Sequence, residues 1–131
     1  MKNNSQGMDM LQAVIRHITL IDSGAENAEI EKYRPADPLK FSIDLEVFVG
    51  IGGRDGSERF DIEACTPSWI IEELRENDCV IGHGKIIVGI YSYEKIIGYI
   101  ESYIKMCKGR NVDDVYRRVG LLGDWESEWE I

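Results

Sequence analysis

Apolar side chains stand at every second position between Phe41 and Ile51, and this alternation constrains the fold more than any other feature of the 131-residue chain. A period of two is that of a β-strand with one buried face. The positions between them carry Ser42, Asp44, Glu46 and Phe48. The pattern therefore predicts a strand from about residue 39 to 51, with a packed face and a partly charged one.

A glycine-rich segment, Gly52-Gly53-Arg54-Asp55-Gly56, follows this strand. Glycine tolerates the positive φ angles that hairpin loops require, so we predict a hairpin here. The returning strand, residues 59–65, directs Phe60, Ile62 and Ala64 inward and leaves Arg59, Asp61 and Glu63 outside. A phosphate-binding loop is disfavoured because the GxGxxG pattern needs glycine where Asp55 stands, and because a strand follows rather than a helix.

Two more strands are predicted from apolar runs. Residues 11–21 place Leu11, Ala13 and Ile15 on one face and Val14, Ile18 and Leu20 on the other, which is typical of a covered interior strand. Residues 85–91 are nearly all apolar, and we place them at the centre of the sheet. Residues 22–38 are expected to form a long loop with a helical turn near 28–33, and the alternating tail, 124–131, an extended segment with Trp125, Trp129 and Ile131 on one face.

Three helices are predicted from caps and apolar periodicity. Thr66 is a candidate N-cap for a helix that begins at Pro67 and ends at Asn77-Asp78. Ser92 caps a helix over 93–108, and Asn111 begins a third helix that ends near Gly120. The order of elements predicts an α+β fold with a central, mainly antiparallel sheet and about three helices packed on one face. We expect a single domain over 1–131, with 1–9 as a flexible tail.

The charge of the chain limits its partners. Fifteen Lys and Arg face twenty-four Asp and Glu, a net charge of -9. Direct nucleic-acid binding is disfavoured because it needs a basic surface. A basic protein partner fits the charge, although acidity also serves solubility alone. The N-terminus has no apolar signal region and no run approaches the ~20 apolar residues of a membrane span, so we expect a cytoplasmic protein without membrane contact.

Few residues suggest chemistry. Cys65, Cys79 and Cys107 form neither a CxxC pair nor an even set, which argues against a disulfide framework or a zinc site. His83, between Gly82 and Gly84, would need a thiol and an orienting carboxylate within reach to act as a general base. The plainer alternative is a turn histidine and buried thiols. We therefore predict no catalytic residue, no cofactor and no metal site.

The outward-facing acids are the candidate binding site. Like charges that face each other across paired strands destabilise a sheet, so a chain that keeps them is expected to use them for a basic partner. The alternative is a solvated face neutralised by Arg54, Arg59 or Lys85. The acids of the tail carry the same ambiguity. The predicted partner-binding residues are Asp44, Glu46, Asp61, Glu63, Glu126, Glu128 and Glu130.

A family resemblance rests on the same region. The strand FSIDLEVFVGIGG, the strand and exit RFDIEACTPSWI, the apolar strand after His83, the helix that ends at Cys107 and Trp125 together resemble the immunity protein 8 family of bacterial polymorphic toxin systems. The resemblance spans about residues 10–130, but only 41–69 is specific. Its pattern contains no catalytic residue.

The resemblance implies a cytoplasmic antidote, not an enzyme. Members of this family bind a cognate toxin domain, including toxins of contact-dependent growth inhibition, and block it stoichiometrically. Many such toxins are nucleases with basic surfaces, which would suit an acidic inhibitor. Two alternatives remain open from the sequence: a small enzyme that uses Cys65 or Cys79 with His83, and a non-catalytic adaptor that recruits a peptide at the sheet edge or the tryptophan tail.

Overall fold

A computed structural model describes residues 10–22, 25–28 and 30–129 of the chain. Strands and helices are mixed along the sequence, which confirms the predicted α+β class. The elements are β1 (Leu11–Asp22), β2 (Ala25–Ala28), β3 (Ser42–Ile51), β4 (Glu58–Cys65), α2 (Pro67–Glu76), β5 (Lys85–Ile87), α3 (Tyr93–Lys105), β6 (Lys108–Gly109), α4 (Val112–Val119), β7 (Asp124–Trp125) and a 3-10 helix, Glu126–Trp129.

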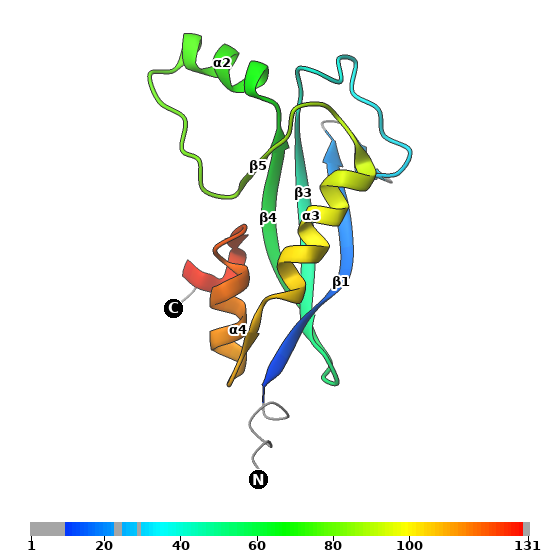
Figure 1. Ribbon diagram of the computed structural model, residues 1–131, viewed down its shortest axis with the longest axis vertical. Helices are drawn as coiled ribbons and strands as arrows, with labels where there is room; N and C mark the ends of the chain where they lie inside the picture. Colours follow the sequence, from blue (N-terminus) through cyan, green and yellow to red (C-terminus); the bar gives the residue numbers. More distant parts are fainter. Residues whose placement is uncertain (1–9, 23–24, 29, 130–131) are drawn as a thin grey trace.

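The strands form one sheet in the order β2-β1-β3-β4-β5, with β6 paired to β1 and β7 paired to β4 (Figure 1). All pairs are antiparallel except β4 with β5, which is parallel. The prediction of a mainly antiparallel central sheet is therefore confirmed. The prediction of a long loop with a helical turn over 22–38 is wrong at 25–28, because these residues form β2.

The apolar run 85–91 was predicted to lie at the centre of the sheet, and this prediction is wrong. Only Lys85–Ile87 is a strand, and it lies at the edge. The second half of the run, residues 88–91, lies in the loop between β5 and α3. The Tyr91 amide donates to the Pro38 carbonyl at 2.8 Å, and the Tyr91 ring packs edge-on against Phe41 at 5.2 Å between centroids. Only part of the run is packed, since Ile87 and Ile90 are 57% and 50% exposed.

Strands β3 and β4 follow the predicted alternation. The inward side chains of both strands are at most 5% exposed, and those of Val47, Phe60 and Ala64 are fully buried. Gly53 and Gly56 in the hairpin have φ angles of 80° and 95°, which only glycine adopts without strain. The middle of the sheet is therefore a β3–β4 hairpin in which every second side chain faces the core, as predicted.

Strand β1 contains a β-bulge that the sequence analysis missed. Ile15 faces Val49 of β3, but the next pair is His17 with Phe48, so one extra residue, Arg16, stands in β1. The bulge shifts the alternation and brings Ile18 and Leu20 to the same face as Ala13 and Ile15, whereas Val14, before the bulge, stays on the opposite face. Leu20 is consequently fully buried on the same side as Ala13. The predicted division of β1 into two apolar faces is therefore wrong beyond Ile15.

Helices α3 and α4 cover the apolar face of the sheet (Figure 1). Each begins at a capping side chain: Ser92 Oγ accepts from the Lys95 amide at 3.4 Å, and Asn111 Oδ1 accepts from the Asp114 amide at 2.8 Å. Their buried residues are Ile96, Ile100, Ile104, Val115, Tyr116 and Val119. These two helices and the inward side chains of β1, β3 and β4 form the core.

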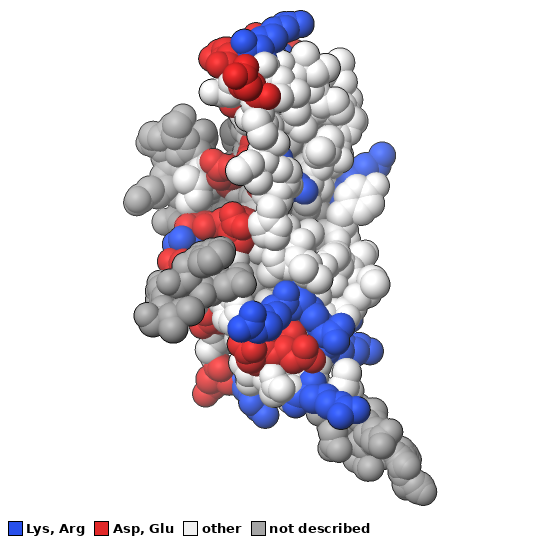
Figure 2. Space-filling model, turned by 90° about the vertical axis from the view of Figure 1, so that its left-hand side faces the viewer, with Lys and Arg blue, Asp and Glu red and all other residues white. Residues whose placement is uncertain are grey.

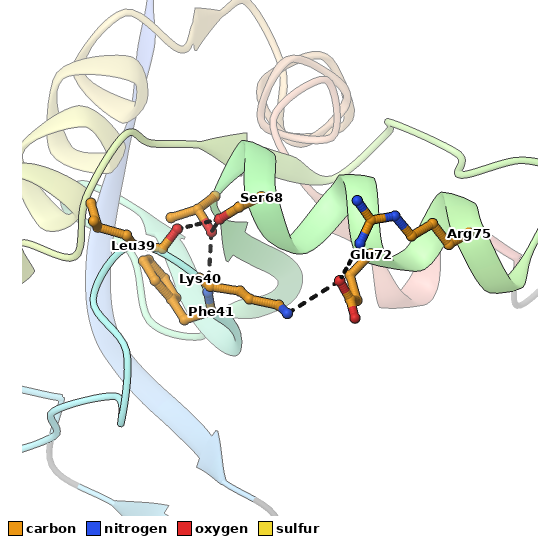
Figure 3. Close-up of polar contacts among 7 residues, drawn as sticks. Leu39, Lys40, Phe41, Ser68, Glu72 and Arg75 are labelled. Carbon is orange, nitrogen blue, oxygen red and sulfur yellow. Dashed lines mark hydrogen bonds and ion pairs between the residues drawn. The ribbon is translucent and has the colours of Figure 1, made fainter.

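Helix α2 projects past the end of β4 and contains no buried residue (Figure 1). Pro67 stands in its first turn as predicted, but the Thr66 hydroxyl does not cap the helix. It accepts instead from the Phe41 amide at 3.1 Å. Polar contacts hold α2 against residues 39–41: Ser68 Oγ donates to the Leu39 carbonyl, and Glu72 pairs with Lys40 at 3.2 Å (Figure 3).

The C-terminal segment is extended only at Asp124–Trp125 and then forms a 3-10 helix, so the predicted extended tail is wrong beyond Trp125. Trp125 packs inward, with its ring 6.0 Å from Phe60 and 5.6 Å from Tyr116. This contact with the core turns the chain and ends the alternation. The side chains of Glu128 and Trp129, and residues 1–9, 130 and 131, lie outside the described residues.

Candidate functional site

The open face of the sheet carries a hollow of about 370 Å³ that is rich in carboxylates. We call it the acidic hollow. Strands β3 and β4 form its floor, and β5, β7 and the turn before β5 form its wall. Its lining residues are Ile21, Asp44, Leu45, Glu46, Asp61, Ile62, Glu63, His83, Gly84, Lys85 and Asp124.

The strand register brings four of the predicted site residues together. Asp44 directly faces Glu63, and Glu46 directly faces Asp61. The predicted proximity of these acids is thus confirmed. Figure 2 shows acidic side chains at several levels along one side of the molecule. Opposed carboxylates at this spacing repel each other, which costs the sheet a few tenths of a kcal/mol per pair, up to about 1 kcal/mol.

Lys85 offsets part of this repulsion. Its Nζ donates to Glu63 Oε1 at 2.8 Å, and Ser42 Oγ donates to the other Glu63 oxygen at 2.6 Å. The lysine side chain is 14% exposed. The hydrogen bond to Glu63 raises the pKa of Lys85, against the opposing effect of burial. Glu63 is therefore satisfied within the protein and has little capacity left for a partner.

Arg59 connects three further acids. Its guanidinium lies 3.3 Å from Glu46, 3.1 Å from Asp61 and 3.1 Å from Glu126. The 3.1 Å contact with Asp61 involves Nε, which is buried and makes no hydrogen bond of good geometry. Glu126, predicted from the tail, is thus linked through Arg59 to two acids of the hollow, Glu46 and Asp61. The predicted neutralisation by Arg59 and Lys85 is present, whereas Arg54 lies in the hairpin turn.

Asp44 differs from the other acids. Its side chain is exposed, and in the described part of the chain it forms no ion pair or hydrogen bond. Desolvation raises its pKa most, followed by the charges of Glu63 and Asp61, and Lys85 opposes the shift. Asp44 is therefore a carboxylate held among like charges without a cation of its own.

Two residues of the hollow were missed by the sequence analysis. His83 Nε2 lies 3.0 Å from Asp124 Oδ1, and both side chains are more than 45% exposed. They meet because β5 pairs in parallel with β4 while β7 pairs on the same strand. Gly84, with φ of 77°, turns the chain so that its carbonyl accepts from the Glu63 amide at 2.8 Å. The glycines on both sides of His83 indicated a turn in the sequence, but they did not indicate that Asp124 lies beside this histidine.

The thiols do not form a catalytic pair with His83. Burial, followed by the charge of Glu63, raises the pKa of Cys65 to about 11, so this thiol stays protonated at neutral pH. A protonated, buried thiol is a poor nucleophile. Cys79 is exposed, and no hydrogen bond joins either thiol to His83 among the described residues.

We expect only one of the three thiols to react with a disulfide reagent such as DTNB in the native protein at pH 7. Cys79 is exposed, whereas Cys65 and Cys107 are buried, with raised pKa values. All three should react after unfolding in guanidinium chloride. The absorbance of the released thiolate gives the count, and Cys79→Ser is the control that should abolish the fast phase. Rapid native labelling of Cys65 would contradict this assignment.

Other kinds of site lack support in the structure. Within residues 10–22, 25–28 and 30–129, no three His, Cys, Asp or Glu side chains are arranged to hold a metal ion. None of the helices in these segments is both long enough and apolar enough to cross a membrane. The acidic hollow is thus described by its charges and hydrogen-bond acceptors.

Comparison with known proteins finds one relationship. The sequence matches the family described as Immunity protein 8 over residues 14–129. No curated protein and no solved structure matches the chain. The matched segment includes strands β3 and β4, helices α2, α3 and α4, and all lining residues of the acidic hollow. Because this match covers most of its length, the chain belongs to the Immunity protein 8 family.

Proposed function

We propose that this protein is a cytoplasmic immunity protein that binds a cognate toxin domain through the acidic hollow and blocks it by occlusion. The toxin is a basic domain of a polymorphic toxin or contact-dependent inhibition system, and a nuclease fits the charge best. The antidote itself has no catalytic role. The observation that carries the proposal is Asp44, an exposed carboxylate among like charges that forms no ion pair within the described part of the chain.

The internal ion pairs define which acids are available. Glu63 is saturated by Lys85 and Ser42, and Arg59 is shared among three acids. An Arg or Lys from a partner would therefore gain most at Asp44, where it relieves repulsion as well as forming a pair. Unlike Asp44, the acids of α4 have cations of their own: Asp113 pairs with Arg117 at 2.7 Å and Asp114 pairs with Arg118 at 3.6 Å. Figure 2 shows basic and acidic side chains mixed in one cluster low on this face.

The test is a comparison of two neutralised variants in binding to the toxin domain encoded by the adjacent gene. Asp44→Asn removes a charge from the acidic hollow, and Glu94→Gln removes one from an exposed position at the start of α3. We expect Asp44→Asn to slow association several-fold at low salt and to flatten its salt dependence, since charge complementarity acts mainly on the on-rate. Glu94→Gln, with the same net charge, should leave both unchanged. Stopped-flow fluorescence or surface plasmon resonance measures the rates.

Stability separates a binding effect from a folding effect. Folding raises the pKa of Asp44 from its ordinary value of 3.8, so its charge costs stability above that raised pKa and costs nothing below 3.8. Asp44→Asn should therefore be neutral or stabilising by a few tenths of a kcal/mol at pH 7. Slower binding by a variant of undiminished stability supports the proposal. Equal association rates for Asp44→Asn, Glu94→Gln and the wild type would remove the acidic hollow from the interface.

A further inference from the structure

Strand β1 has an open edge between two paired ends. On the side away from β3, it pairs with β6 at Leu11 and Gln12 and with β2 at Leu20 and Asp22. Among the described residues, 14–19 pair with no strand on this side. Figure 1 shows β1 at the margin of the sheet with α3 lying beside it. Six residues at strand spacing make a gap about 20 Å long.

Part of the backbone at this gap points away from β3. The Ala13 amide donates to the Cys107 carbonyl at 3.0 Å, on the side away from β3. The Gln12 carbonyl accepts from the Gly52 amide at 2.9 Å, on the side of β3. Because these directions alternate along an antiparallel strand, the N–H and C=O of Ile15 point the same way as those of Ala13. At Ile15, directly before the bulge, the edge gap therefore presents one backbone donor and one acceptor to another extended backbone.

A groove runs along the same edge. It has a volume of about 470 Å³ and lies between β1 and the last turns of α3. Ala13, Ile15 and Ile104 supply apolar surface, and Glu101 and Lys105 are exposed on the helix side. The remaining lining residues are Gln12 and Val14. A strand added to β1 would place alternate side chains over this groove.

We propose that the edge gap of β1 binds an extended segment of the cognate toxin domain as an added strand. This inference rests on the proposed function and adds a second contact to it. The segment would be about four to six residues long, antiparallel or parallel to β1, with an apolar side chain directed into the groove. Backbone hydrogen bonds would supply affinity, and the groove would select the side chain, as in other strand-addition complexes.

The shape of the edge decides between occupants. A second copy of this chain has its own edge recessed between β6 and β2, so two such edges do not reach each other. A protruding loop or hairpin of a different protein does reach the gap. The bulge at Arg16 also protects an edge from indiscriminate pairing. Protection of the edge would not require that the Ile15 backbone point away from β3. It would not require a groove lined by Ala13, Ile15 and Ile104 either, so we favour a specific partner.

Amide hydrogen exchange tests the backbone contact. In the free protein, the Ile15 amide should exchange quickly, because no strand covers it. In the complex with the toxin domain encoded by the adjacent gene, we expect this exchange to slow at least about tenfold. The Gly52 amide, already bonded to Gln12, should change little and is the internal reference. A complex in which Ile15 remains unprotected would overturn the inference while leaving the proposed function intact.

Two matched tryptophan variants test the groove. Glu101→Trp places a large side chain over the groove, whereas Ser102→Trp places it at the next exposed position of α3, outside the lining. We expect Glu101→Trp to weaken binding about tenfold or more through faster dissociation, and Ser102→Trp to bind like the wild type. Thermal unfolding shows whether each variant folds.

The outcomes separate the two proposals. Asp44→Asn should still show Ile15 protection in its complex, since the acidic hollow and the edge gap are different surfaces. If both tryptophan variants bind with the affinity of the wild type, the groove is not part of the binding site. Concentration-dependent dimers of the free protein with Ile15 protected would assign the edge to a second copy and also overturn it. Failure of the wild type to bind the toxin domain would overturn the proposed function and this inference together.

Discussion

Replacing Phe60 by alanine is expected to lower the free energy of unfolding by about 3–5 kcal/mol. The Phe60 side chain is fully buried on β4. Its ring centroid lies 6.0 Å from those of both Tyr116 on α4 and Trp125 on β7. The substitution therefore leaves a cavity where the sheet, a helix and the C-terminal segment meet. Equilibrium unfolding in urea, followed by far-UV circular dichroism, gives the change.

Phe48 provides the matched control for this prediction. It belongs to the neighbouring strand β3 but points to the open face, where it is half-buried beside His17 at 6.1 Å between ring centroids. Phe48→Ala removes the same atoms without opening an internal cavity, so we expect a loss of only about 1 kcal/mol. Similar losses for the two variants would show that Phe60 does not occupy the core as described.

Replacing Lys85 by methionine is expected to destabilise the protein by about 2 kcal/mol at neutral pH. Methionine keeps most of the apolar stem but removes the ammonium group that bonds Glu63 at 2.8 Å. Glu63, whose side chain is only 20% exposed, then retains Ser42 alone and faces Asp44 without compensation. A part-buried charge that loses its partner is costlier than an exposed one. The same urea titration measures the loss.

The pH dependence of this loss identifies its cause. Folding raises the pKa of Lys85 above its ordinary value of 10.5, mainly through the hydrogen bond to Glu63. The stability that Lys85 contributes is therefore fully present below 10.5 and is lost as pH rises through the raised folded pKa. The difference in free energy of unfolding between the wild type and Lys85→Met should become smaller at pH values above the folded pKa of Lys85. Lys95→Met, at an exposed position of α3, corrects for general alkaline effects. A constant difference would point to packing rather than charge.

The parts of the fold that could be predicted are those set by local pattern. The alternation over 41–51, the hairpin glycines and the capped helices α3 and α4 depend on neighbours in sequence, and all were predicted correctly. The run 85–91 was misplaced because periodicity does not distinguish a buried central strand from a short edge strand and a loop, in which Tyr91 packs on Tyr33 and Phe41 while Ile87 and Ile90 are exposed. Thr66 was assigned to a helix cap because its competing partner, Phe41, lies 25 residues earlier.

The same limit applies to the acidic hollow. Asp44, Glu46, Asp61 and Glu63 were predicted to be neighbours because a short hairpin joins their strands. His83 and Asp124 could not be assigned to the same place, since they arrive through a parallel pair and a two-residue strand near the C-terminus. Which acid lacks a cation depends on the directions of Arg59 and Lys85, and sequence spacing does not determine those directions.

Because of the bulge in β1, one residue of this strand, Arg16, is not needed for the packing of the core. Without Arg16, the strand would alternate regularly from Ile15 through Leu20 and bury the same side chains. What the extra residue adds is its guanidinium, which donates to the Ile51 and Arg54 carbonyls and lies against Gly50. Loss of Arg16 would therefore loosen the hold on the 52–56 turn while leaving the packed layer unchanged. The length of the strand at this point thus acts on the hold of one loop and not on the core.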